Sequence, residues 1–221
     1  MAITLVQSVS TGAGSVSSVT TAGITTTSGN LVVVDVGYDG GTFTSITDNK
    51  SNTWTARVAE QSFSNGAKGQ RRDNSSITGG ASHTFTLTCT ANTFPAIAVS
   101  EISGQSASPA DQSAVGGAFG TAATTAATAT TAQANELLLE GSVFDGGETF
   151  TPTAPRTKLQ DTGGLGGSGV STSYRIVSAT GTYSGAGTGS VNDLWTMWIT
   201  TYMEAAASTA TVLPVMFFDN P

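Results

Sequence analysis

Apolar and polar side chains alternate with a period of two over much of this chain. The clearest case is residues 84–90, where Phe85, Leu87 and Cys89 occupy every second position and threonine fills the others. Successive side chains of a β-strand point to opposite faces, so this pattern predicts a strand with one buried and one solvated face. Such strands are typical of antiparallel sheets.

Three further runs, residues 31–36, 97–102 and 194–203, have apolar residues on both faces and predict strands in the middle of stacked sheets. Clusters of glycine, asparagine and aspartate between the apolar runs favour turns, and no segment has a convincing helical period. The pattern predicts an all-β protein, a two-sheet antiparallel jelly-roll-like sandwich. Its core is expected to contain Trp54, Phe85, Leu87, Ile97, Val99 and Trp198.

Two parts of the chain have weakly similar sequences. Residues 30–44 read as an Asn, an apolar run and an Asp-Gly-Gly turn, and residues 135–151 repeat this order with small shifts. One interpretation is convergence of turn and strand chemistry, and the other is that both copies begin equivalent halves of one sandwich. We expect a single β-sandwich domain over residues 1–204 with two pseudo-repeated halves, followed by a C-terminal extension or final edge strand at residues 205–221.

The charge balance narrows the choice of partner. Charged residues make up 10% of the chain, and its formal net charge is −7. The eight lysines and arginines leave little to neutralise phosphates or anionic lipids, and no apolar window is long enough for a membrane helix, so we expect neither nucleic acid nor membrane as a partner. We interpret the doublet Arg71–Arg72 as part of a solvated loop and the single cysteine, Cys89, as a buried thiol.

Few residues are suited to catalysis. His83 is the only histidine, and we predict that it lies at the surface or at a sheet edge. One histidine and one cysteine exclude the familiar zinc sites. Glu136 and Glu140 share a face of one predicted strand at a separation of about 13 Å, which exceeds the roughly 5 to 9.5 Å between glycosidase carboxylates. We therefore expect a non-enzyme with no catalytic residue and no cofactor, although a tertiary contact such as Glu101 with Asp193 keeps a glycoside hydrolase as a third hypothesis.

Two loops resemble ligand sites but have simpler interpretations. Asp48, Asn49 and Asn52 offer side-chain oxygens of the kind that calcium prefers, yet the same residues stabilise a hairpin through Asx hydrogen bonds, and we expect no metal site. Residues 164–169 match the pattern G-x-G-x-x-G. That motif binds a pyrophosphate only when a helix follows it, and none is predicted here, so we interpret the segment as a loop.

Short motifs carry a resemblance to a known class of proteins. Residues 45–55 contain D-N-x-x-N-T-W, residues 100–104 contain E-x-S-G, and an aromatic strand surrounds Trp195 and Trp198. Together they resemble the concanavalin-like jelly-roll sandwiches of phage virion proteins and bacterial surface proteins over residues 2–204. Residues 1–6 lack the basic and apolar stretches of a secretory signal. The resemblance therefore implies a virion protein that is assembled in the host cytoplasm without a signal peptide.

Two functions follow from this resemblance. The first is a non-enzymatic structural protein of a phage virion, such as a capsid decoration, head-fibre or tail-associated protein, which contacts other virion proteins and forms a homo-oligomer. The alternative is a carbohydrate-binding module or adhesin that binds a cell-surface glycan through loops at one rim of the sandwich. The candidate residues for such a rim site are Tyr38, Asp39, Asp145 and Asn192.

The C-terminus carries the strongest apolar signal outside the predicted strands. Six large apolar side chains within residues 212–218 would form an aggregation-prone patch on a soluble monomer if they stayed exposed. One interpretation is a last strand on the protein's own sandwich, which Pro214 would restrict to an edge or a bulge. The other is an assembly arm that packs on a neighbouring subunit through Leu213, Val215, Met216, Phe217 and Phe218.

Overall fold

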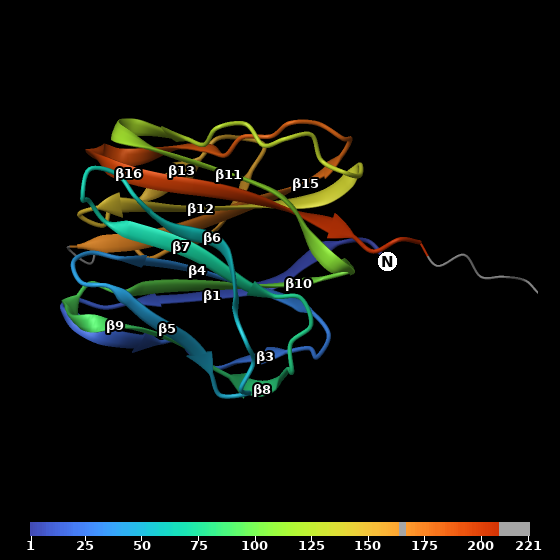
Figure 1. Ribbon diagram of the computed structural model, residues 1–221, viewed down its shortest axis with the longest axis horizontal. Helices are drawn as coiled ribbons and strands as arrows, with labels where there is room; N and C mark the ends of the chain where they lie inside the picture. The colour runs from blue at the N-terminus through green and yellow to red at the C-terminus, as the bar shows by residue number, and fades with distance from the viewer. Residues whose placement is uncertain (164–166, 208–221) are drawn as a thin grey trace, which may run out of the picture.

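The computed structural model describes residues 1–163 and 167–207, and this part of the chain is all-β, with antiparallel sheets and no barrel closure (Figure 1). It contains no helix long and apolar enough to span a membrane. The strands are β1 (Thr4–Gly12), β2 (Val16–Thr20), β3 (Ile24–Thr26), β4 (Leu31–Tyr38), β5 (Phe43–Asp48), β6 (Thr55–Ser62), β7 (Lys68–Asn74), β8 (Gly80–His83), β9 (Phe85–Thr93), β10 (Ala96–Ser103), β11 (Gln105–Thr124), β12 (Asn135–Asp145), β13 (Phe150–Pro152), β14 (Thr157–Asp161), β15 (Ser168–Ser178) and β16 (Ala186–Glu204).

The first half of the chain forms a sandwich of its own. One sheet has the order β1-β10-β4-β7-β6, and a smaller sheet, β2-β9-β5, covers its outer face. Between these sheets Phe85 and Leu87 pack on Val34, Val36 and their neighbours in one apolar cluster. The period-two pattern of residues 84–90 therefore folds as predicted, with the threonines on the other face of β9.

The second half repeats this strand order. Its main sheet runs β11-β16-β12-β15-β14, which is the first sheet's order with each strand replaced by its counterpart from the second half. The segment at residues 125–131 bonds to residues 181–185, and β13 pairs with the start of β16, so an outer layer equivalent to β2-β9-β5 is also present. The similar segments, residues 30–44 and 135–151, form the equivalent central strands β4 and β12 and the turns that follow them.

The two main sheets lie face to face in the middle of the molecule (Figure 1). Strand β1 lies against β14, and β6 lies against β11 and β16, as an approximate twofold relation between the halves requires. Trp198 from β16 fills the centre of this interface. A Cβ atom added to Gly69 or Gly141 would lie only 2.4 Å from the Trp198 ring, so each sheet provides a glycine where the indole inserts.

Buried charges also join the two halves. Arg71 is fully buried, and its Nε and Nη2 donate to the two carboxylate oxygens of Asp35 at 2.8 and 3.0 Å. From the second half, the Trp198 indole donates to Asp35 Oδ1 at 2.6 Å, and the Leu139 carbonyl accepts from Arg71 Nη1 at 2.7 Å. The predicted solvated loop at Arg71 is therefore wrong, because Arg71 is on the buried strand β7.

The all-β sandwich prediction is confirmed, and so is most of the predicted core. Phe85, Leu87, Ile97, Val99 and Trp198 are buried. The exception is Trp54, which is only partly buried and packs edge-on against Phe85 with ring centroids 5.8 Å apart. Cys89 is buried as predicted, and burial raises the pKa of its thiol to about 11.

Candidate functional site

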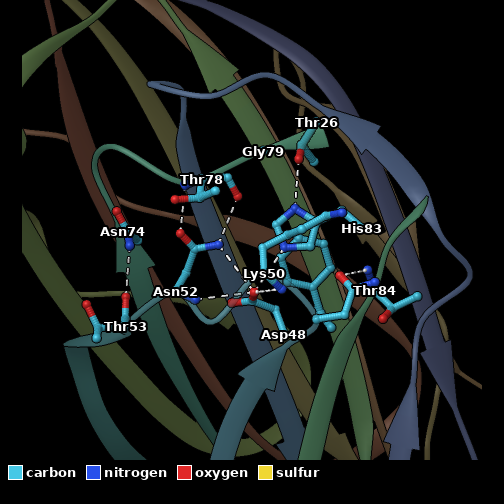
Figure 2. A network of polar contacts seen from close by, with 12 residues as sticks. Thr26, Asp48, Lys50, Asn52, Thr53, Asn74, Thr78, Gly79, His83 and Thr84 are labelled. Carbon is cyan, nitrogen blue, oxygen red and sulfur yellow. Dashed lines mark hydrogen bonds and ion pairs between the residues drawn. The ribbon is translucent and has the colours of Figure 1, made fainter. Parts of the chain in front are cut away.

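The Asp48 turn is the centre of a network of polar contacts in the first half, and Figure 2 shows it from close by. Asp48 Oδ1 accepts from the backbone N–H of Lys50 at 2.7 Å and from that of Asn52 at 3.3 Å. Asn52 in turn exchanges two hydrogen bonds with the backbone of Thr78, at 2.7 and 3.1 Å. The D-N-x-x-N motif thus stabilises its own turn and attaches it to the next loop, as the Asx interpretation predicts.

His83 lies under this turn, not at the surface. The side chain is completely buried, stacks on Phe85 at a centroid distance of 4.2 Å and places Nε2 3.3 Å from Asp48 Oδ1. Its Nδ1 is 2.7 Å from the Thr26 hydroxyl. The predicted surface position is therefore wrong, because His83 continues the inward phase of Phe85 and Leu87. The predicted sheet-edge position is confirmed, since His83 ends β8 in the two-stranded sheet β3-β8.

Thr26, His83 and Asp48 form a hydroxyl–imidazole–carboxylate series of the kind that activates a nucleophile in hydrolases. Here the series is inaccessible, because Thr26 is buried as well as His83. Burial lowers the pKa of His83 below its usual value although the Asp48 charge opposes the shift, so the imidazole is neutral at pH 7. The series joins β3, β5 and β8 as a structural link.

Of the residues predicted to form a rim site, Tyr38 does not lie at the surface. Tyr38 is fully buried, and its hydroxyl binds Glu60 and accepts from Gln70 Nε2 at 3.3 Å, so its assignment as an exposed rim ligand is wrong. Tyr38 points inward because it shares the phase of Val34 and Val36 on β4.

Asp39 and Asp145, in contrast, come together at one rim. Burial raises the pKa of Asp145, and the charges of Asp39 and Asp193 add to the shift. A Cβ atom on Gly146 would lie 2.8 Å from a Glu148 oxygen and 3.0 Å from an Asp193 oxygen, so these two carboxylates converge there. Asn192, next to Asp193, is exposed. The structure thus gathers an acidic rim from both halves, although no group of metal-ligating geometry was found among the described residues.

The acids considered for glycoside hydrolysis have separate partners. Glu101 accepts from Gln7, from the Thr27 backbone and from Asn30 in the first half, well away from the acidic rim. Glu140 pairs with Arg156 and accepts from Ser173 at 3.0 Å.

Glu136 is a buried carboxyl group whose protonation is linked to folding. Burial raises its pKa to about 7, and the nearby charge of Asp111 adds to the shift. The folded state therefore binds a proton more tightly than the unfolded state does, so the stabilising contribution of this proton is lost as the pH rises from about 4.5 to about 7.

We predict that Glu136→Gln flattens this pH dependence. The variant should be more stable than the native protein at pH 8 by about 1 to 3 kcal/mol and nearly equal to it at pH 4. Urea unfolding at a series of pH values measures the difference. Parallel profiles for the two proteins would show that Glu136 does not carry the proton.

A groove of about 340 Å³ lies between β5, the loop that precedes β6 and Arg72 of β7, and Phe43, Trp54 and Arg72 line it beside Asn52. The Arg72 guanidinium carbon lies 4.5 Å from the centre of the Phe43 ring. Partly exposed aromatic rings beside an arginine and an amide are a combination that suits a polar, ring-shaped ligand. The motif that precedes Trp54 drew attention to this region, but the contribution of Phe43 and Arg72 needed the tertiary structure.

A second surface feature lies along β11, which is an edge strand of its sheet. Ser113, Val115, Gly117 and Phe119 are exposed in alternation, and Phe119 retains 66% of its surface. Sequence reasoning missed this site, because the stretch is rich in glycine and alanine. The detectable signal was the period-two placement of its two large apolar residues.

Two predicted features lie outside the described residues. They are residues 164–166 of the predicted glycine-rich loop and the proposed arm residues Leu213, Val215, Met216, Phe217 and Phe218. Comparisons with protein-family models, with curated proteins and with solved structures found no match.

Proposed function

We propose that this protein is a non-enzymatic structural component of the phage-virion type, such as a decoration, head-fibre or tail-associated protein, which acts through protein–protein contacts. The observation that carries the proposal is the row of exposed apolar residues on the edge strand β11. Val115 and Phe119 retain 39% and 66% of their surface, and Phe63 beside them retains 36%. Adjoining exposed apolar side chains on an edge strand mark a contact surface.

Other features of the chain fit this role. The two halves are joined by hydrogen bonds between the buried Asp35–Arg71 pair of the first half and Trp198 and Leu139 of the second, and by the inserted Trp198 ring, which make one stiff unit. The C-terminal apolar segment, residues 212–218, supplies a second candidate contact element. The motifs that resemble concanavalin-like virion sandwiches form a surface turn and the end of β10, and Gly104 then joins the first half to the second.

A carbohydrate-binding module is the second candidate, and the groove at Phe43, Trp54 and Arg72 is the observation that favours it. In that case the protein would bind a cell-surface glycan, with the aromatic rings stacking on a sugar and Arg72 donating to its hydroxyl or carboxylate groups. Substitution of Trp54 by alanine would then abolish retention on a glycan array.

Truncation after Ala207 tests the structural role. We expect the full chain to be oligomeric by light scattering, and the truncated chain to keep its melting temperature while losing oligomerisation or incorporation into particles. A full chain that stays monomeric at high micromolar concentration and binds glycans through Trp54 would contradict the proposal. A truncated chain that assembles normally would contradict the role of the arm.

A further inference from the structure

The row of exposed side chains on β11 is the uncovered end of the interface between the two halves. Val115 pairs with Trp198 and Phe119 pairs with Leu194, so both project from the face of the second sheet that packs on the first half. The facing sheet ends at β6, and Phe63, which follows β6, extends over this row. A Cβ atom on Gly117 would lie 3.2 Å from Phe63 Cβ, so the phenyl ring rests against Gly117. We call Phe63, Val115, Gly117 and Phe119 the β11 seam.

The molecule contains a second seam for comparison, because β1 and β14 are the counterparts of β11 and β6. That seam is closed. Ser10 donates to Gln160 at 2.7 Å, Gln160 donates to Ser8 at 2.8 Å, and Leu5 and Leu159 pack on the shared apolar cluster. At equivalent places in the fold, one seam is thus bridged by the chain's own side chains and the other is left apolar and open.

The chain also carries an apolar segment with a matching period. Leu213, Val215 and Phe217 alternate at a spacing of two residues, as Val115, Gly117 and Phe119 do in the seam. In an extended conformation these three side chains would point to one face and could pack along the row. Pro214 is compatible with this arrangement, because a segment added at the outside of a sheet is one of the few strand positions that tolerate proline.

The direction of the chain distinguishes between the segment's own seam and that of a neighbour. Phe119 pairs with Leu194, ten residues before the end of β16 at Glu204. Figure 1 shows β16 running toward the side of the molecule where the described chain leaves the body, whereas β11 runs the opposite way. A segment that binds its own seam would have to turn back after Glu204 and run past six to ten residue positions of β16, whereas a segment that binds the seam of a second copy needs no such reversal.

We propose that the β11 seam is the docking site for the C-terminal segment, residues 212–218, of a second copy of this chain. The inference rests on the proposed structural function and names its partner. Because the segment and the seam are different surfaces, two copies either exchange their segments reciprocally in a twofold dimer or add head to tail into a ring or a filament.

Mixing two complementary variants tests the proposal. The chain that ends at Ala207 keeps the seam and lacks the segment, whereas Val115→Asp with Phe119→Asp keeps the segment and loses the seam. Each variant alone is expected to be monomeric by light scattering, and an equimolar mixture should give a one-to-one dimer that grows no further. Ile176→Asp is the matched control, because Ile176 is 49% exposed on β15 and the substitution should leave assembly unchanged.

A synthetic peptide of residues 208–221 provides a second measurement that does not depend on the double variant folding. It should bind the chain that ends at Ala207, and Phe119→Asp in that chain should weaken binding at least tenfold. Peptide binding to the truncated chain combined with a monomeric full chain would show that each segment occupies its own seam, and would overturn the second-copy assignment. Truncation that abolishes assembly while the seam variant assembles like the native chain would overturn the inference and leave the proposed function standing.

Discussion

Replacement of Asp35 by alanine is expected to lower the free energy of unfolding by about 3 to 5 kcal/mol, because it leaves the guanidinium of Arg71 buried without a counter-charge. Asp35 accepts two hydrogen bonds from Arg71 and one from the Trp198 indole, so three buried donors lose their acceptor at once. Equilibrium unfolding in urea, followed by tryptophan fluorescence, measures the effect.

Two comparisons separate the charge from the packing. Asp35→Asn keeps the volume and some of the hydrogen bonds, and its cost should be intermediate. Asp35→Leu combined with Arg71→Met removes both charges and should recover part of the loss, although the Trp198 N–H and the Leu139 carbonyl then lack partners. Asp39→Ala at the rim serves as the control and should have little effect. A loss below about 1 kcal/mol for Asp35→Ala would mean that water reaches Arg71.

The strands were predictable wherever a single physical requirement dominates the sequence. Along β9 the alternation of apolar residues with threonine indicates that one face is buried. Along β4 the apolar run indicates that both faces are buried. These patterns identify the strand, its phase and its central position without knowledge of its neighbours. Trp54 was less predictable, since a residue at a sandwich edge is covered only as far as the adjacent strand extends.

The burial of polar residues could not be predicted from the sequence, because it depends on a partner that is distant in the chain. Arg71 is on a strand of charged and amide residues with no apolar signal, and only the pairing of β7 with β4 places it beside Asp35. His83 and Tyr38 have the same phase as their apolar neighbours, so the period-two pattern contained the correct answer for both. The polar chemistry of the two residues led to the wrong assignment.

The candidate sites were predictable only in part. The two Asp-Gly-Gly turns could be recognised as related, but it is the face-to-face packing of β4 and β12 that brings Asp39 and Asp145 to one rim. The β11 seam could not be predicted from the sequence, because its side chains are exposed where the opposite sheet ends at β6. A local sequence pattern carries no information on where a facing layer stops.

Replacement of Leu87 by alanine is the second large effect, with an expected loss of about 2 to 5 kcal/mol. Leu87 is fully buried in the middle strand of the outer sheet, and it pairs with Val19 on one side and Ile46 on the other. The two neighbouring strands and the main sheet beneath hold the site open, so the deleted methyl groups leave a cavity that closes only partly. For a chain of this size the melting temperature should fall by about 2 to 4 °C for each kcal/mol.

The comparison of Leu87→Ala with Asp35→Ala also tests how the two halves unfold. Leu87 belongs to the core of the first half alone, whereas Asp35 bonds to Trp198 of the second half. If the interface makes unfolding cooperative, both variants should show one transition, shifted as a whole. If Leu87→Ala instead splits the transition, the second half is stable on its own and the buried ion pair does not couple the halves. Val16→Ala, at an exposed position of the same outer sheet, is the control and should change the stability by less than about 0.5 kcal/mol.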